Sequence, residues 1–108
     1  MNLHDVQERV DAWIRDTAGG YWGQFEILAR LTEELGELSA ALQRDQGLRP
    51  RKSEADVTEE IGDVLFTLAA FANVRKINLQ DAIDQVLAKY EMRDGDAWRH
   101  REAEELQS

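Results

Sequence analysis

The sequence has no cysteine, and its 108 residues include only one proline and two histidines. Without cysteine, neither a disulfide nor a zinc site built from thiolates can form. The first residues contain no apolar run like that of a signal peptide, and no stretch approaches the roughly 18 apolar residues of a membrane-spanning helix. We therefore expect a cytoplasmic protein with no membrane partner.

Basic residues are also scarce, because 13 lysines and arginines stand against 22 aspartates and glutamates. A nucleic-acid-binding protein needs a basic face, so this balance argues against a nucleic-acid partner. A phosphorylated ligand remains compatible with the charge if divalent cations lie between it and the carboxylates. The length is that of one domain, which we place at residues 1–93, with a polar C-terminal helix or tail over residues 94–108.

The alternation of apolar and polar residues that marks a half-buried strand is missing from the sequence. Apolar residues recur instead in four segments, at the three- and four-residue spacing of amphipathic helices. The positions expected to face inward are Leu3, Val6, Val10 and Trp13; Leu28, Leu31, Leu35, Leu38 and Leu42; Val57, Ile61, Val64, Leu68 and Phe71; and Leu79, Ile83, Val86, Leu87 and Tyr90. We therefore predict an all-α fold, with a bundle of four to five helices in each protomer.

The breaks between these segments have the composition of loops. Residues 17–23 contain three glycines, and residues 45–53 contain a glycine and the only proline. Ser53 is placed to cap the third helix, and Asn78 is placed to cap the fourth. A loop of about nine residues between the second and third helices favours antiparallel packing of this central pair.

Two similar acidic motifs lie within the central helices, EELGEL at residues 33–38 and EEIGDV at residues 59–64. Each motif crowds three acids together and places a glycine in mid-helix, where it costs about 1 kcal/mol relative to alanine. Because glycine has no side chain, Gly36 and Gly62 leave room for another backbone, a metal or a ligand to approach closely.

The acids of the two motifs have matching positions around their helices. From a helical rotation of about 100° per residue, Glu34 and Glu60 lie about 80° from the centre of their apolar stripes, and Glu37 and Asp63 lie about 140° from it in the same sense. In an antiparallel pair, the two clusters would converge on one flank. Four convergent carboxylates repel one another unless a hard divalent cation lies among them. We expect this cation to be Mg²⁺, for which Mn²⁺ can substitute.

Two other interpretations of the acids have to be considered. Acids on the polar face of a helix are commonly just solvated. Two matched motifs, each with an internal glycine, are much less expected by chance than a single one. A di-iron carboxylate bundle would need a Glu-x-x-His motif on two helices, whereas His4 and His100 lie near the ends of the chain and outside both motifs. The motifs therefore favour a site for Mg²⁺ or Mn²⁺.

The order of these acids resembles the signature of the MazG-like, all-α nucleoside triphosphate pyrophosphohydrolases: E-E-x-x-E at residues 33–37, then 22 residues, then E-x-x-D at residues 60–63. The similarity extends over roughly residues 22–93. It implies a Mg²⁺-dependent enzyme that splits a nucleoside triphosphate between the α and β phosphorus atoms, giving a nucleoside monophosphate and pyrophosphate. It also implies a homodimer or homotetramer in which helices of paired subunits surround each site.

The resemblance assigns roles to particular residues. It implies that the metal ligands are Glu34, Glu37, Glu60 and Asp63, and that Glu33 orients the attacking water or takes its proton. Lys89 and Arg93, four residues apart on the last helix, match basic positions that would meet the β and γ phosphates.

Recognition of the base is indicated by fewer residues. Trp22, just before the acidic helix, could stack on a nucleobase, with Trp13 and Trp98 as alternatives. Asn73 could offer its amide to a base or a phosphate.

The rival hypothesis is a non-catalytic acidic module for oligomerisation or interaction, whose apolar stripes are oligomer seams. The preferred base and sugar and the choice between dimer and tetramer are left open.

Overall fold

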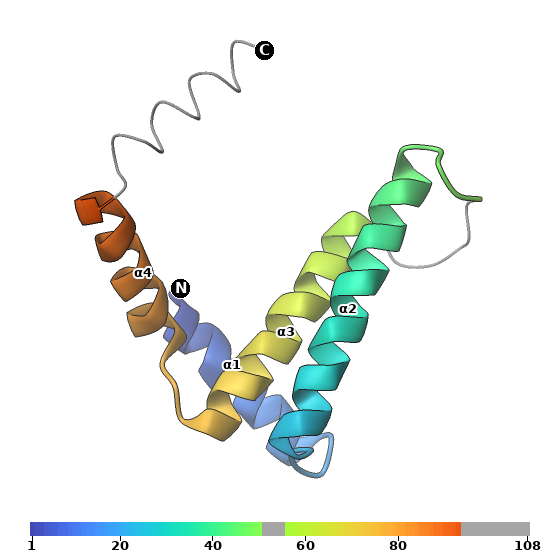
Figure 1. Cartoon of the computed structure of the whole chain (residues 1–108). Coiled ribbons are helices and arrows are strands. Elements are labelled where there is room, and N and C mark those ends of the chain that lie inside the picture. The colour runs from blue at the N-terminus through green and yellow to red at the C-terminus, as the bar shows by residue number, and fades with distance from the viewer. Residues whose placement is uncertain (51–55, 94–108) are drawn as a thin grey trace.

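The computed structural model describes residues 1–50 and 56–93, and these residues form four helices. They are α1 (Leu3–Asp16), α2 (Gln24–Asp45), α3 (Val57–Arg75) and α4 (Leu79–Arg93) (Figure 1). No strand occurs in the ranges described, which confirms the all-α prediction. No helix in the same ranges is long and apolar enough to cross a bilayer.

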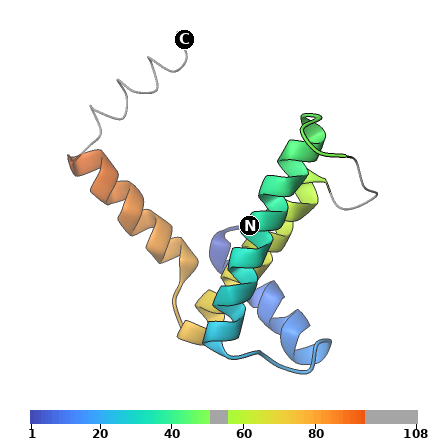
Figure 2. The same ribbon diagram turned by 45° about the vertical axis from the view of Figure 1, so that its right-hand side comes forward.

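The arrangement is an antiparallel pair with two helices attached at one end. Helices α2 and α3 run side by side in opposite directions, while α1 crosses the end of the pair where α2 begins and α3 finishes (Figures 1 and 2). Helix α4 packs against α1, and its C-terminal end leads away from the α2–α3 pair in both views. The predicted antiparallel pairing of the two acidic helices is therefore present.

Side-chain caps fix where α3 and α4 begin. The Asp56 carboxylate accepts a hydrogen bond from the Glu59 N–H at 2.9 Å, so Asp56 is the N-cap of α3. The prediction that Ser53 fills this position was wrong, and Ser53 itself lies outside the described residues. The Asn78 side chain accepts from the Asp81 N–H at 3.0 Å, which confirms it as the cap of α4.

The apolar core lies where α1 crosses the helix pair. Its buried members come from three helices and are small or medium in size, and no large side chain of the described residues is wholly enclosed. They are Val10 and Ile14 of α1, Ile27 of α2, and Ala69 and Ala70 of α3. One chain thus buries little apolar surface, and the acidic half of the α2–α3 pair lies beyond this core.

The inward face of α2 differs from the predicted stripe. Leu28, Leu35 and Leu42, which we call the leucine row, were expected inside but are 44%, 51% and 51% exposed. The face against α3 consists of Ile27, Leu31, Glu34, Leu38 and Ala41. At about 100° per residue, this face is rotated by about 60° from the centre of the leucine stripe. Among the four described helices, α3 is the one that runs along α2, so it covers one side of a broad stripe and leaves the other open.

Other predicted core positions are exposed for the same reason. On α1, Ile14 is buried in place of the exposed Trp13. The exposed members of the later stripes are Ile61 and Leu68 on α3 and Ile83, Leu87 and Tyr90 on α4. Apolar faces this extensive on separate helices are typical of surfaces that pair with another subunit.

The two helix-interior glycines have open surroundings in the chain. A Cβ atom added at Gly36 or Gly62 would meet no atom within 4 Å. Among the described residues, no other part of the chain therefore fills the space beside either glycine. Approach by a metal, a ligand or a second subunit stays a prediction.

Candidate metal centre

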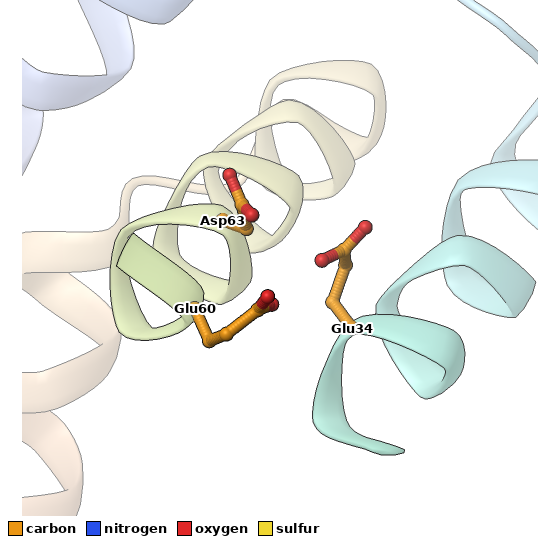
Figure 3. A group of neighbouring side chains, drawn as sticks. All are labelled: Glu34, Glu60 and Asp63. Atoms are coloured by element: carbon orange, nitrogen blue, oxygen red, sulfur yellow. The ribbon is translucent and has the colours of Figure 1, made fainter. Parts of the chain in front are cut away.

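Three carboxylates from the two acidic motifs converge between α2 and α3. Glu34 extends from α2 toward Glu60 and Asp63, which lie one turn apart on α3 (Figure 3). One carboxylate oxygen from each residue lies within 4.8 Å of the other two. Antiparallel packing and the three-residue spacing on α3 are sufficient to bring them together. Glu34 and Glu60 are buried in the contact between the helices and not on its flank as expected, because the packing face of α2 includes Glu34, whereas Asp63 is exposed.

Burial makes this cluster electrostatically costly. Glu34 is 8% exposed and Glu60 is 6% exposed. The Glu60 Oε2 atom is buried and has no hydrogen-bond partner among the described residues. Loss of solvation raises the pKa of Glu60, and the charges of Asp63, Glu34 and Glu37 raise it further, against a smaller opposing effect of Arg44.

The donor set fits a hard divalent cation. All three groups offer carboxylate oxygen, the ligand type that Mg²⁺ and Mn²⁺ prefer, and neither histidine nor cysteine takes part. A cation here would offset the mutual repulsion of the acids and give the unpaired Glu60 oxygen a partner. The residues therefore fit the metal that the sequence motifs predicted.

Two other predicted acids lie at the border of this cluster. Glu37 is exposed and is not one of the three closest carboxylates, although its charge contributes to raising the pKa of Glu60. Glu33 is exposed, and its charge helps to raise the pKa of Arg30. Both are thus within electrostatic reach of the site. Glu59, the first acid of the second motif, is exposed as well.

Arg30 is a residue that the sequence reasoning missed. Its Nε donates a hydrogen bond of 2.8 Å to Oε1 of Glu34, one helical turn later on α2. This bond and the nearby charges of Glu34, Glu33 and Asp63 raise the pKa of the guanidinium. The available signal was the four-residue spacing between Arg30 and Glu34, which places both on one helix face.

A cavity of about 410 Å³ opens beside the carboxylates. Glu34, Asp63 and Arg30 line it together with aromatic rings of Trp13, Tyr21, Trp22 and Phe66. Trp22, the predicted base-stacking residue, is 57% exposed at this wall, and Trp13 shares the wall with it. The third tryptophan considered, Trp98, lies outside the described residues.

The predicted amide contact, Asn73, takes part in a hydrogen-bond network between helices. Its Nδ2 donates to the Gln7 carbonyl and to the Tyr21 hydroxyl, each at 3.1 Å, and its Oδ1 accepts from Gln7 Nε2 at 3.0 Å. Tyr21 donates in turn to Asp11. The network joins α3 to α1 and holds Tyr21 at the cavity wall.

The structure does not bring Lys89 and Arg93 to the carboxylates of the same chain. Both belong to α4, which packs against α1 and whose C-terminal end leads away from the α2–α3 pair (Figures 1 and 2). The Lys89 ammonium lies 5.3 Å from the centroid of the neighbouring Tyr90 ring. A role at the site would require α4 of another subunit.

Comparison with known proteins agrees with this geometry. A model of the MazG nucleotide pyrophosphohydrolase domain matches residues 23–98. The uncharacterized protein YpjD of Bacillus subtilis (strain 168) is 42% identical over 103 residues, which cover 93% of each chain. The crystal structure of YpjD has a TM-score of 0.76 at 41% identity and covers 87% of this chain and 97% of that one. The crystal structure of the Bacillus-conserved MazG protein, a nucleotide pyrophosphohydrolase, has a TM-score of 0.73 at 38% identity. It covers 89% of this chain and 96% of that one.

The helical fold and its acidic centre, together with these comparisons, identify an all-α hydrolase. More particularly, the chain belongs to the MazG nucleotide pyrophosphohydrolase family, since the family model matches well over half of its length. The resemblance inferred from the order of the acids is thereby confirmed. Membership also favours an enzyme over the non-catalytic module that the sequence alone left open.

Proposed function

We propose that the protein is a Mg²⁺-dependent nucleoside triphosphate pyrophosphohydrolase that cleaves between the α and β phosphorus atoms. Its products are a nucleoside monophosphate and pyrophosphate, a reaction suited to cleaning or balancing a nucleotide pool. The observation that carries the proposal is the convergence of Glu34, Glu60 and Asp63, together with a buried oxygen of Glu60 that has no hydrogen-bond partner among the described residues. Family membership supports the reaction class.

In this proposal Glu34, Glu60 and Asp63 hold the cation, and Glu37 completes the ligand set from the next turn of α2. A bound Mg²⁺ or Mn²⁺ supplies charge neutralisation for the phosphates and lowers the pKa of a water molecule. Glu33, at the exposed border of the site, orients the attacking water and accepts its proton.

The cavity beside the carboxylates is the proposed place for the nucleoside. Trp22 offers an exposed ring for stacking on the base, and Trp13 borders the same space. The Asn73 amide would have to release Gln7 and Tyr21 to reach a substrate, so we infer that it acts on recognition through the position of Tyr21.

We further infer that the active form is a homodimer or homotetramer. The exposed leucine row on α2 supports this, because side chains of this size and spacing are typical of helix seams. Lys89 and Arg93 supply a second argument. They can bind the β and γ phosphates only if α4 reaches the site of a partner subunit.

The test is ³¹P NMR of a panel of ribo- and deoxyribonucleoside triphosphates incubated with the protein and Mg²⁺. Monophosphate and pyrophosphate as the products would support the proposal, and the member consumed fastest would identify the preferred base and sugar. Orthophosphate and diphosphate would show that a different bond is cleaved. The Glu60→Gln variant serves as the negative control, and activity retained in it would contradict the assigned metal site.

A further inference from the structure

The cavity beside the acidic cluster has two chemically different parts. Glu34 and Asp63 form one part, and the rings of Trp13, Tyr21 and Trp22 belong to the other. In a nucleoside triphosphate, the α phosphate is the group that joins the flat base and its sugar to the charged β and γ phosphates. If the base meets the rings and the cation lies at the carboxylates, the α phosphate has to cross the boundary between the two parts.

Arg30 lies at this boundary. Its Nε is bonded to Glu34 at 2.8 Å, and the carbon of its guanidinium lies 6.0 Å from the centroid of the Trp22 ring. The guanidinium therefore connects the carboxylate part to the aromatic part. In the portion of the chain that the structure describes, Arg30 is the one basic side chain that lines the cavity.

The geometry leaves donors of Arg30 for a ligand. A guanidinium has five N–H donors, and the bond to Glu34 is made by Nε. The terminal nitrogens belong to a side chain that is 50% exposed, whereas the Glu34 side chain is only 11% exposed. Glu34 and the Trp22 ring thus limit the motion of the guanidinium while its outer edge stays accessible from the cavity.

Stabilisation of the helix does not explain this arrangement well. Ion pairs with four-residue spacing contribute about 0.3–0.5 kcal/mol when exposed. The order is also the weaker one, since an acid that precedes a base along a helix interacts better than the reverse. A lysine would satisfy the charge equally, but only arginine combines a planar group that stacks on tryptophan with a fork that matches phosphate oxygens.

We propose that Arg30 is a phosphate-binding residue of the active site and contacts the α phosphate, the one at which the substrate is cleaved. This inference rests on the proposed function, because it takes the cation to lie at Glu34, Glu60 and Asp63. Negative charge redistributes over the phosphate oxygens during transfer, and a fixed guanidinium stabilises it without reorganisation. Arg30 thus supplies a positive charge from the same chain at the α phosphate, whereas the family resemblance assigned Lys89 and Arg93 to the β and γ phosphates.

Binding measurements separate contact with phosphate from mere support of Glu34. The probes are Mn²⁺ alone, followed by electron paramagnetic resonance, and inorganic tripolyphosphate with Mg²⁺, followed by calorimetry. Loss of hydrogen bonds between charged groups corresponds to a factor of about 10–100 in affinity. We expect Arg30→Gln to weaken tripolyphosphate binding by that factor and to leave the Kd for Mn²⁺ within about threefold of wild type.

Two variants serve as controls. Arg49→Gln removes an exposed guanidinium that bonds to Gln43 near the end of α2, and it should bind both probes like the wild type. Arg30→Lys retains the charge but not the planar fork, so it should fall between wild type and Arg30→Gln with tripolyphosphate. If the glutamine variant loses its helical circular dichroism, the lysine variant alone decides the comparison.

The outcomes distinguish this inference from the proposed function. Equal weakening of Mn²⁺ and tripolyphosphate binding in the Arg30 variants would show that Arg30 only positions Glu34, and unchanged binding of tripolyphosphate would show that it does not touch phosphate. Either result overturns the inference while the metal site stands. If the wild type binds neither probe, the proposed function fails, and the role of Arg30 fails with it.

Discussion

Glu60→Gln is a change for which the structure predicts opposite effects on stability and on activity. The Glu60 side chain is buried, and its Oε2 atom has no partner in the described residues. A buried polar atom without a partner costs about 1–3 kcal/mol. Glutamine has the same size, carries no charge, and can donate a hydrogen bond to Glu34 or Asp63. In EDTA near neutral pH we therefore expect the free energy of unfolding to rise by about 1–3 kcal/mol. For a domain of this size the melting temperature rises by roughly 4–8 °C for each kcal/mol.

The stability that Glu60→Gln gains over the wild type should decrease as the pH falls. Burial and like charges raise the pKa of Glu60 in the folded protein above its value in the unfolded chain, so the folded state binds the proton more readily. Ionised Glu60 therefore lowers the free energy of unfolding of the wild type at pH values above its pKa in the folded state. This destabilisation disappears as the pH falls through that pKa toward the pKa of the unfolded chain. The advantage of Glu60→Gln should shrink on acidification from neutral pH.

Thermal melts followed by circular dichroism, in EDTA and in Mg²⁺, test this reasoning. Mg²⁺ should stabilise the wild type, by about 2.7 kcal/mol at a concentration of 100 Kd. It should have little effect on the variant, which we expect to be inactive. Glu59→Gln is the matched control, because it makes the same change at the adjacent, exposed position. A variant that melts below the wild type in EDTA near neutral pH, or a control with an equal gain, would refute the repulsion argument.

Three other changes are predicted from the packing. Asp56→Ala removes the cap of α3 and should cost about 1 kcal/mol in a denaturant titration, whereas Asp56→Asn should cost little. Gly36→Ala should stabilise the helix by up to about 1 kcal/mol, because a Cβ atom there meets nothing within 4 Å; a loss of stability would reveal a partner against that surface. Leu35→Glu, in the leucine row, should shift the sedimentation profile toward monomer while helical content is retained, and Leu48→Glu, in the loop after α2, should leave assembly unchanged.

The elements of this fold could be predicted from sequence because the signals for them are local. Helix periodicity and loop composition identify the four helices, and the cap at Asn78 follows from the residue type and its position. The side of each helix that faces inward could not be predicted as well. A broad apolar stripe indicates that some neighbour covers it, but it does not indicate which of its residues pack against the same chain. The leucine row is the part that the same chain leaves exposed.

In the candidate site too, some features could be predicted from local sequence signals, whereas others depend on how the helices pack. Spacing alone grouped four acids, Glu34, Glu37, Glu60 and Asp63, because two antiparallel helices bring equal rotational offsets together. The structure brings three of them together and leaves Glu37 at the border. Arg30 was missed because its four-residue spacing from Glu34 is common on exposed helix faces and does not by itself mark a site; the packing places its guanidinium between Glu34 and Trp22. For Lys89 and Arg93 the motif spacing fixes their common face but carries no information about the direction that α4 takes.

The position of the acids in the α2–α3 contact has a consequence for how the chain is held together. Apolar packing is concentrated where α1 crosses, around Ile14, Ile27 and Ala69, whereas farther along the pair the buried side chains facing each other include Glu34 and Glu60. Like charges there oppose the approach of the two helices that the core at the other end enforces. A divalent cation reverses the sign of that interaction, since each carboxylate is then attracted to a charge it shares with the opposite helix. The same carboxylates that would bind the cation for catalysis would therefore also join α2 to α3, which links occupation of the site to the stability of the fold.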